Sequence, residues 1–256
     1  LTDRYIAEHL QKLGVKSGMK VVVHSSLLSF GHVQRQTSVF IEELVKAVGA
    51  SGTIAVPTFT LQLTSNDLFD PASTPSRTSA LSEAFRVLPG TIRSPSPLHS
   101  YTALGKDSDI VSTAAANRSF GEGSCLDRFV TDNFHWLFLG CGSRGEGCTL
   151  SHHTEATFGV PYRKWISFPR KILSPSNKIV DIEYHYYARR DGFSAKLNVM
   201  PVQEELLFNR KMTKIKAPIG FSYFSKAMDI HGTGLKLLEK DPYSLTQPAR
   251  GNTAVF

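Results

Sequence analysis

The sequence predicts an α/β protein with a mixed, partly parallel sheet flanked by helices and with a second, smaller lobe. Short β-branched segments alternate with segments whose apolar residues recur at helical spacing, which is the pattern of a layered α/β fold. The chain has 256 residues, enough for one large domain or for two closely packed lobes with a substantial core.

The first sixty residues show the alternation most clearly. We expect a helix, a strand, a helix and a strand over residues 3–13, 20–24, 38–48 and 53–57, in that order. Ser25 and Ser26 follow the first strand and are residue types that cap helix starts.

The remaining elements are less regular. We expect a polar loop over residues 61–78, a helix over 80–87, a rigid connector over 93–97, a strand over 99–104, helices over 107–116 and 124–131, and a strand over 136–140. A Gly-rich turn follows at 140–147. Beyond it we expect a strand over 179–187, a basic stretch of mixed character over 206–219 and a helix over 224–239.

Composition describes an ordinary soluble chain. No apolar stretch approaches the roughly 20 residues that a membrane-spanning helix needs, and no secretory leader is evident. The three cysteines are an odd number without disulfide-framework spacing, which favours reduced thiols and a cytoplasmic location.

Charge is unevenly placed along the chain. Residues 1–160 carry 13 Lys and Arg against 14 Asp and Glu, whereas residues 161–256 carry 16 against 8. We therefore divide the chain into a lobe over 1–160 and a basic lobe over 161–256 that completes a substrate cleft, the two packed closely or forming one domain. Positive potential attracts anions, and because no nucleic-acid recognition motif is present we favour phosphate-bearing small molecules.

The most informative residues are His152 and Glu155. If this stretch is helical, their spacing places both on one face, and a carboxylate that orients an imidazole makes a general base. The alternative from the pattern alone is a surface helix that happens to carry both residues.

A set of motifs in a fixed order links this pair to a known family. They are His24-Ser-Ser-Leu27, Gly52-Thr-Ile-Ala-Val-Pro57, Arg77-Thr-Ser-Ala-Leu-Ser-Glu83, Arg93-Ser94, His99-Ser100, Gly121-Glu-Gly-Ser124, Leu139-Gly140 and Thr149-x-x-His152-x-x-Glu155. This ordered set resembles the aminoglycoside 3-N-acetyltransferase family, across about residues 20 to 155. One departure is Ser96-Pro97, where many members have His-Pro, and it puts the usual geometry of the amine substrate in doubt.

The resemblance implies acetyl transfer from acetyl-CoA to an amine, without a metal, by direct transfer. It implies His152 as the general base and Glu155 as the residue that orients it. It places Arg77 and Thr78 in a motif associated with the coenzyme pocket, although exposed arginines commonly contact only water. From the residues themselves, free N–H groups at a helix start favour phosphate or an oxyanion, so the turn at Ser25, Ser26 and Leu27 is the best local candidate for the coenzyme. Pro57 and His99 complete the predicted coenzyme site, although a lone histidine after a Pro-rich turn is as often a structural residue, and we predict substrate contacts at Glu122, Cys141 and Thr149. Local evidence leaves alternatives open: the serines could only cap a helix, and Glu122 could cap the helix that follows it.

Two rival roles for cysteine remain at this point. Cys141 could accept the acetyl group first, although a cysteine directly after a buried strand is more often a small core residue. Cys141, Cys148 and a histidine at 152 or 153 could also be imagined as zinc ligands, but their spacing matches no common zinc pattern.

The basic last third of the chain decides the substrate prediction. Aminoglycosides are polycations and call for carboxylates, so we predict a nucleotide-linked amino sugar, a thymidine-diphosphate 3-amino-3,6-dideoxyhexose used in surface polysaccharide (O-antigen) assembly. The alternatives are an aminoglycoside 3-N-acetyltransferase that confers resistance, and a non-enzymatic binding module of the same fold. No partner protein and no oligomeric state follow from the sequence.

Overall fold

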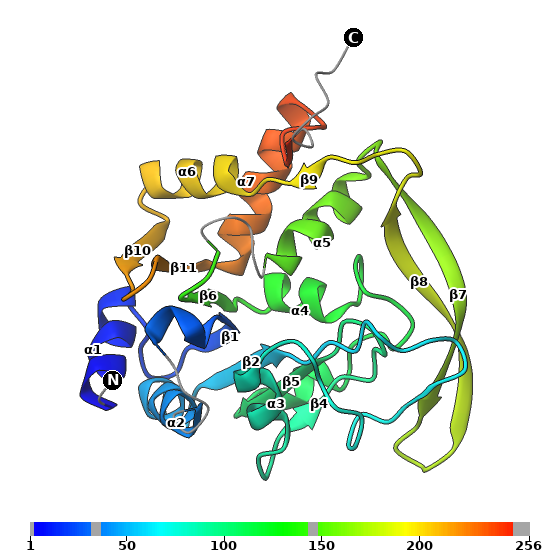
Figure 1. The fold of residues 1–256 in the computed structure, drawn as a ribbon, viewed down its shortest axis with the longest axis horizontal. Coiled ribbons are helices and arrows are strands. Elements are labelled where there is room, and N and C mark those ends of the chain that lie inside the picture. The colour runs from blue at the N-terminus through cyan, green and yellow to red at the C-terminus, as the bar shows by residue number, and fades with distance from the viewer. Residues whose placement is uncertain (1–2, 32–36, 143–147, 248–256) are drawn as a thin grey trace.

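The computed structural model describes residues 3–31, 37–142 and 148–247. Its main sheet has seven strands in the order β10-β11-β6-β1-β2-β5-β4 (Figure 1). Along the chain these are β1 (Lys20–Ser25), β2 (Thr53–Pro57), β4 (Ile92–Arg93), β5 (Tyr101–Gly105), β6 (His135–Leu139), β10 (Met212–Lys216) and β11 (Phe221–Lys226).

Parallel pairing is confined to the middle of this sheet. β1 lies between β2 and β6 and is parallel to both. β5 is antiparallel to β2, and β11 is antiparallel to β6. The sheet is therefore mixed and partly parallel, and the predicted fold class is confirmed.

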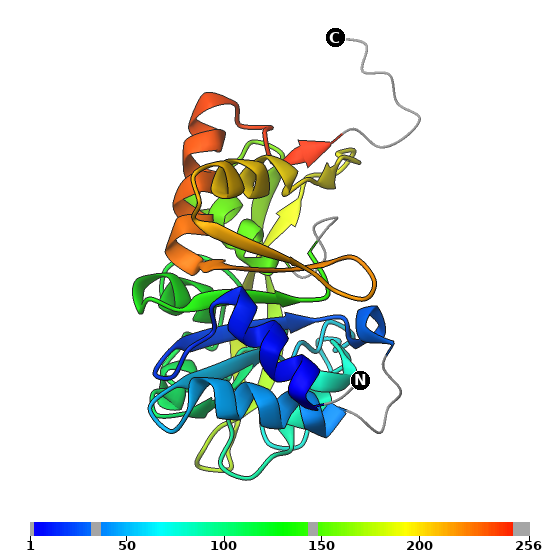
Figure 2. The same ribbon diagram turned by 90° about the vertical axis from the view of Figure 1, so that its left-hand side faces the viewer.

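Helices cover both faces of the sheet, which explains the apolar run of β1. One face carries α1 (Asp3–Leu13), α2 (Thr37–Val48) and α3 (Ala80–Arg86), and α1 and α2 lie in front of the strands in Figure 2. Val21 and Val23 pack into this layer. Val22 points the other way, into the core beneath α4 (Cys125–Thr131), α5 (Thr149–Phe158), α6 (Met200–Phe208) and α7 (Ala227–Lys240).

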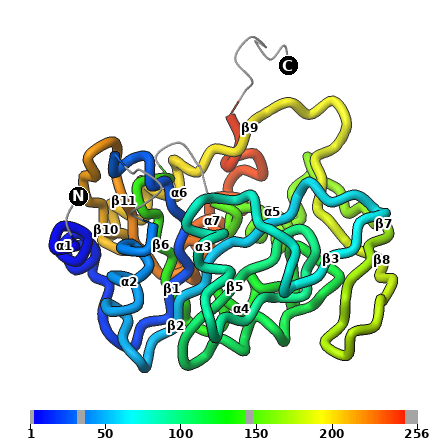
Figure 3. Tube along the Cα trace, turned by 60° about the horizontal axis from the view of Figure 1, so that its bottom comes forward, coloured from blue at the N-terminus to red at the C-terminus, as the bar shows by residue number. Residues whose placement is uncertain are grey.

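A smaller sheet lies at one edge of the molecule. β7 (Arg163–Leu173) and β8 (Ile179–Arg189) form a long antiparallel hairpin, and β3 (Leu68–Phe69) runs parallel to β7 beside it (Figure 3). A further short pair joins β9 (Lys196–Leu197) to β12 (Thr246–Gln247). β10 and β11 lie beyond residue 161 in the chain but belong to the main sheet.

Several predicted elements are wrong in extent. Residues 107–116 form only the short 3-10 helix η3 (Ser108–Val111), because Ala115 N donates to Gly123 O and the chain leaves the helical path. The helix predicted from residue 224 begins at Ala227, since the preceding residues pair with β6. The predicted loop at 61–78 contains β3, and the stretch at 206–219 contains the end of α6 and all of β10. β7 was not predicted, and residues 143–147 of the Gly-rich turn lie outside the described residues.

No helix in the described part of the chain combines the length and the apolar character that crossing a bilayer requires.

Candidate active site

The carboxyl ends of the three parallel strands bring most of the predicted site residues to one edge of the sheet. β1 ends at Ser25, β2 at Pro57 and β6 at Leu139, directly before Gly140 and Cys141. β5 runs the opposite way, so its start at Tyr101 pairs with Pro57 and His99 lies at the same edge. Ligands in open α/β sheets bind outside the carboxyl ends of parallel strands, so this edge is where a site is expected.

α5 supplies the central pair. The helix spans Thr149–Phe158, and the i, i+3 spacing brings His152 Nδ1 to within 2.7 Å of Glu155 Oε2. The side chain of Glu155 is 1% exposed, whereas that of His152 is 26% exposed. The carboxylate is therefore internal and the imidazole reaches solvent.

Tyr162 and Arg163, which follow α5 in the chain, complete the surroundings of Glu155. Tyr162 donates its hydroxyl proton to Oε1 at 2.8 Å, and Arg163 Nε lies 2.9 Å from Oε2. Burial alone would raise the pKa of Glu155, but the hydrogen bond and charge of His152, then the charge of Arg163 and the hydroxyl of Tyr162, outweigh it and lower that pKa. Glu155 is thus an ionised carboxylate in the interior of the protein.

Sequence reasoning missed Tyr162 and Arg163. Gly159 ends α5 in the left-handed conformation with φ of 81°, and the chain turns back so that β7 starts beside the helix it has just left. The signal available in the sequence was this glycine followed by Pro161, which together predict a reversal within reach of Glu155.

His99 is held by hydroxyl groups. Its Nδ1 lies 2.8 Å from Ser119 Oγ, which lies 2.9 Å from the Tyr184 hydroxyl, which lies 2.7 Å from Ser96 Oγ. All four side chains are buried. Burial, and after it the charge of His152, lower the pKa of His99 to about 3. His99 is therefore a neutral imidazole.

The rings of the two histidines meet the same neighbour. Phe120 lies 5.1 Å from His99 and 5.9 Å from His152, measured between ring centroids. Tyr186 stacks on His99 with an interplanar angle of 5°. The structure thus brings together His152 from α5 and His99 from the segment before β5. It also gives Ser96, the departure from the family pattern, a place in the hydroxyl chain.

The Ser25–Leu27 turn does not start a long helix. Only the four-residue 3-10 helix η1 (Leu27–Phe30) follows, and Ser26 makes no side-chain capping bond there, so the predicted capping role is wrong. Ser26 N already donates to Leu139 O at 2.9 Å. Ser25 Oγ is shielded from solvent and has no hydrogen-bond partner among the described residues, so this hydroxyl is available to a ligand.

Arg77 and Thr78 lie in the loop between β3 and α3 and are bonded to the backbone of Phe59, two residues after β2. Thr78 Oγ1 accepts a hydrogen bond from Phe59 N at 2.8 Å, and Arg77 N donates to Phe59 O at 3.4 Å. Both side chains are exposed, so the guanidinium of Arg77 is accessible to an anion.

Glu122 and Thr149 have different surroundings. The side chain of Glu122 is exposed, and α4 is capped by Ser124, whose Oγ accepts from Asp127 N, so capping by Glu122 is wrong. Thr149 is buried in the first turn of α5, three residues before His152 and on the same face.

The cysteines do not assemble with the histidines. Cys141 Sγ donates to His24 O at 3.4 Å, and Cys148 Sγ lies 2.9 Å from Ser151 Oγ. His153 Nδ1 accepts a hydrogen bond from Gly121 N, and its ring packs against that of His231. Residues 3–31, 37–142 and 148–247 contain no group of three His, Cys, Asp or Glu side chains arranged to hold a metal ion.

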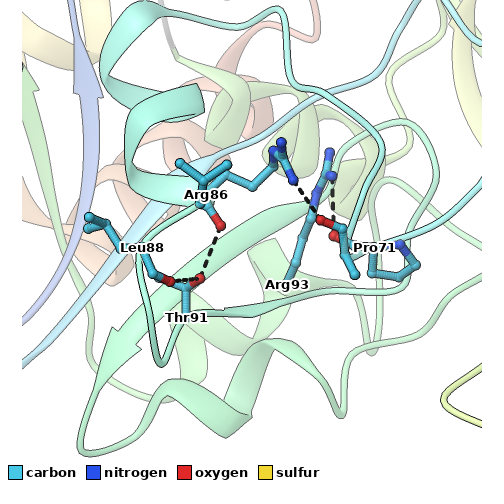
Figure 4. Close-up of a pocket in the computed structure, with 7 residues that line it drawn as sticks. Pro71, Arg86, Leu88, Thr91 and Arg93 are labelled. Carbon is cyan, nitrogen blue, oxygen red and sulfur yellow. Dashed lines mark hydrogen bonds between the residues drawn. The ribbon is translucent and has the colours of Figure 1, made fainter.

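A separate pocket beneath α3 contains two arginines. Both guanidinium groups already donate hydrogen bonds within the protein, which argues against an anion site there. Arg86 and Arg93 lie side by side next to Pro71 (Figure 4). Arg86 donates to Glu83 and to Ala72 O, and Arg93 donates to Ser100, Thr58 O and Thr74 O. Their donors hold the loop at 70–76 in place.

Comparison with known proteins identifies relatives of the whole fold. The family model described as aminoglycoside 3-N-acetyltransferase matches residues 22–207. An aminoglycoside N(3)-acetyltransferase III from Salmonella sp is 31% identical in an alignment that covers 65% of this chain and 64% of that protein. A structure described as AAC-IIIb in a binary complex with CoASH has a TM-score of 0.78 at 23% identity, covering 97% of this chain and 99% of that chain. AAC-VIa bound to sisomicin has a TM-score of 0.78 at 22% identity, covering 94% and 98%.

These comparisons contradict the predicted substrate. The matching family and the curated relatives are named for aminoglycosides, so the nucleotide-linked amino sugar and its place in O-antigen assembly are wrong. The physical error was to treat the charge of a segment as the charge of a site. Most described Lys and Arg side chains after residue 161 are at least partly exposed and screened by water and salt. Of the two described ones that are buried, Arg163 pairs with Glu155, and Arg170 donates to Ser65 and to backbone carbonyls.

Proposed function

Because the chain belongs to the aminoglycoside 3-N-acetyltransferase family, we propose that it transfers the acetyl group of acetyl-CoA to an amino group of an aminoglycoside. The observation that carries this proposal is the contact of 2.7 Å between the partly exposed His152 and the buried, ionised Glu155. The family name and the curated relatives support the 3-amino group as the acceptor.

The reaction forms a bond between the amine nitrogen and the acetyl carbon and breaks the carbon–sulfur bond of the thioester. His152 Nδ1 is engaged by Glu155, so Nε2 is the ring nitrogen that accepts the proton lost by the amine. Glu155 stabilises the imidazolium until the proton passes to the departing sulfur. Proton transfer by a positioned side chain contributes about 10²–10⁴ to a rate.

We assign the coenzyme to the carboxyl edge of the parallel strands. The buried hydroxyl of Ser25 offers an unused donor, and the exposed guanidinium of Arg77 suits a phosphate. Neutral His99 can donate or accept one hydrogen bond without repelling a cationic acceptor. The full set that we propose is Ser25, Ser26, Leu27, Pro57, Arg77, Thr78 and His99.

We assign the acceptor to Glu122, Thr149 and Cys141. The exposed carboxylate of Glu122 suits an ammonium group, and Thr149 lies one helical turn before the base. Cys141 follows β6 at the carboxyl edge of the parallel strands and is the third proposed contact.

We propose that the reaction takes place in the cytoplasm, where cysteines such as the three of this chain remain thiols. We also propose that residues 1–160 bind acetyl-CoA and carry the base, and that residues 161–256 complete the site.

The test is release of thiol from acetyl-CoA with sisomicin as the acceptor. The matched control substrate is sisomicin that is already acetylated at its 3-amino group, and the matched control enzyme is His152→Asn. We expect turnover that requires both the unmodified 3-amino group and His152. Equal rates with the two acceptors would exclude the 3-amino group as the site of acetylation. Thiol release that never exceeds the hydrolytic background would exclude the aminoglycoside as the acceptor.

A further inference from the structure

Arg163 is a buried cation that touches both members of the central pair. Its side chain is 4% exposed, its Nε lies 2.9 Å from Glu155 Oε2, and its Nη2 lies 3.0 Å from His152 Nδ1. Its Nη1 donates to Tyr187 O at 3.1 Å, which fixes the guanidinium against β8. A guanidinium has donors and no acceptor, so a permanent donor and an ionised acceptor face the same ring nitrogen.

Only one of these contacts can be a hydrogen bond in the neutral ring. When Nδ1 carries the proton it donates to Glu155, and the lone pair of Nε2 is available to a substrate. When Nδ1 lacks the proton it accepts from Arg163 Nη2, and Nε2 carries the proton instead. The first tautomer can act as a base towards an amine, and the second cannot.

We propose that Arg163 is a positioning residue that competes with Glu155 for His152 Nδ1, so that the charge on Glu155 selects the tautomer able to accept a proton. This inference rests on the proposed function, because it concerns the same base. The distances agree with the selection: the contact to the carboxylate is 2.7 Å and the contact to the guanidinium is 3.0 Å. A charge-assisted bond to a carboxylate is the shorter and stronger of the two.

Arg163 has a second effect, on the charged form of the ring. The ionisable groups that face His152 are Glu155 and Arg163 on its inner side and neutral His99 beyond Phe120. Tyr162 acts on it through Glu155. The positive charge of Arg163 offsets the negative charge of Glu155, so the imidazolium formed during the reaction can give up its proton again.

A pair of substitutions separates competition from simple support. Glu155→Gln keeps the shape of the side chain and removes its charge, so His152 Nδ1 should accept from Arg163. Because that tautomer cannot act as a base, we expect kcat to fall about 100-fold. Adding Arg163→Met removes the competitor, and we expect the double variant to recover at least about fivefold over Glu155→Gln alone. If Arg163 only supports Glu155, the double variant will be no better than the single one, and the competition is excluded.

The tautomer can be read without any substrate. Nitrogen-15 NMR of the imidazole rings distinguishes a proton on Nδ1 from one on Nε2, and the spectrum of His152→Asn identifies the signal. We expect Nδ1–H in the unaltered enzyme, Nε2–H in Glu155→Gln, and a shift back towards Nδ1–H in the double variant. Nδ1–H in Glu155→Gln would overturn the proposal. If the spectra are as expected but the protein does not acetylate aminoglycosides, the proposed function is overturned and the competition between Arg163 and Glu155 stands.

The electrostatic effect has its own readout. Arg163→Met leaves the charge of Glu155 unopposed, so the acid limb of the pH profile of kcat/KM should move to higher pH. Arg163→Lys keeps a cation and should leave the limb near its original position. Arg163→Gln replaces Arg163→Met if the latter does not fold. An acid limb that is the same in all variants would overturn this part of the proposal.

Discussion

The two histidines beside Phe120 are held by different kinds of partner. His152 contacts a carboxylate and a guanidinium, and about a quarter of its side-chain surface is exposed. His99 contacts a chain of hydroxyls that runs through Ser119 to Tyr184, and it is buried with its pKa lowered to about 3. A charged partner and access to solvent make an imidazole able to take up a proton. Burial among hydroxyls makes one that stays neutral and only forms hydrogen bonds.

The largest expected effect tests the charged side of this comparison. Replacing His152 by Asn should lower kcat at least about 100-fold, because no other group then takes the proton of the amine. The urea midpoint and the far-ultraviolet circular dichroism should stay close to those of the unaltered protein. Near-normal turnover by a folded His152→Asn variant would show that His152 is not the base.

The neutral side can be tested by acid unfolding. The pKa of His99 is about 3 in the folded protein, against an ordinary histidine pKa of 6.5, so the unfolded chain binds a proton that the folded protein refuses. Stability from this group is present above pH 6.5 and is lost as the pH falls towards 3. Between about pH 7 and about pH 4.5 the unaltered protein should therefore lose on the order of 2 kcal/mol more than His99→Gln.

Urea midpoints at the two pH values provide that measurement. Glu155, whose pKa is lowered, contributes in the same direction, since its stabilisation is present above pH 4.5 and is lost as the pH falls through its folded pKa. That contribution is common to both proteins and cancels in the difference. Equal losses in the two proteins would mean that His99 is not held neutral.

A smaller effect on activity is expected from His99→Gln. The substitution removes the one hydrogen bond that the neutral imidazole makes to the coenzyme in the proposed function. Such a bond between neutral groups is worth about 1 kcal/mol, so kcat/KM for acetyl-CoA should fall about five- to tenfold. Because His99 does not titrate near neutral pH, the acid limb of the pH profile should not move. A shifted acid limb would show that His99 exchanges protons during turnover and that the two histidines share one role.

The smallest expected effect concerns the cysteine at the same edge. Cys141 Sγ donates a hydrogen bond to His24 O, so the side chain is turned towards the backbone of β1. Cys141→Ala should therefore keep its turnover within about threefold of the unaltered enzyme. Mass spectrometry after exposure to acetyl-CoA alone should find no acetyl group on Cys141; an acetylated Cys141 together with an inactive Cys141→Ala would establish transfer through the enzyme.

The sequence predicted the local part of the site well. The helix at 3–13 and the strand at 53–57 have the predicted bounds, because apolar periodicity and flanking glycines act within a few residues. The contact of His152 with Glu155 followed from the i, i+3 spacing for the same reason.

The long-range part of the site could not be predicted. The hydroxyl chain joins Ser96, Ser119 and Tyr184, and no spacing relates these positions. β7 was not predicted, and it contains Pro169, a residue type that argues against a strand. β3 pairs only with Lys171 and Ile172, so Pro169 faces no strand partner on that side. The substrate prediction was wrong because net charge along a chain says little about charge at a point in space.

The β7–β8 hairpin reaches both histidines at once. Arg163 at its start contacts His152, and Tyr184 in its second strand anchors the hydroxyls that hold His99. A change in the shape of this hairpin will therefore alter the contacts of His152 and the contacts of His99 in the same step. Changes of acceptor range in this scaffold should come with compensating substitutions near residues 96, 119 and 155, and directed evolution ought to recover them as linked sets rather than one at a time.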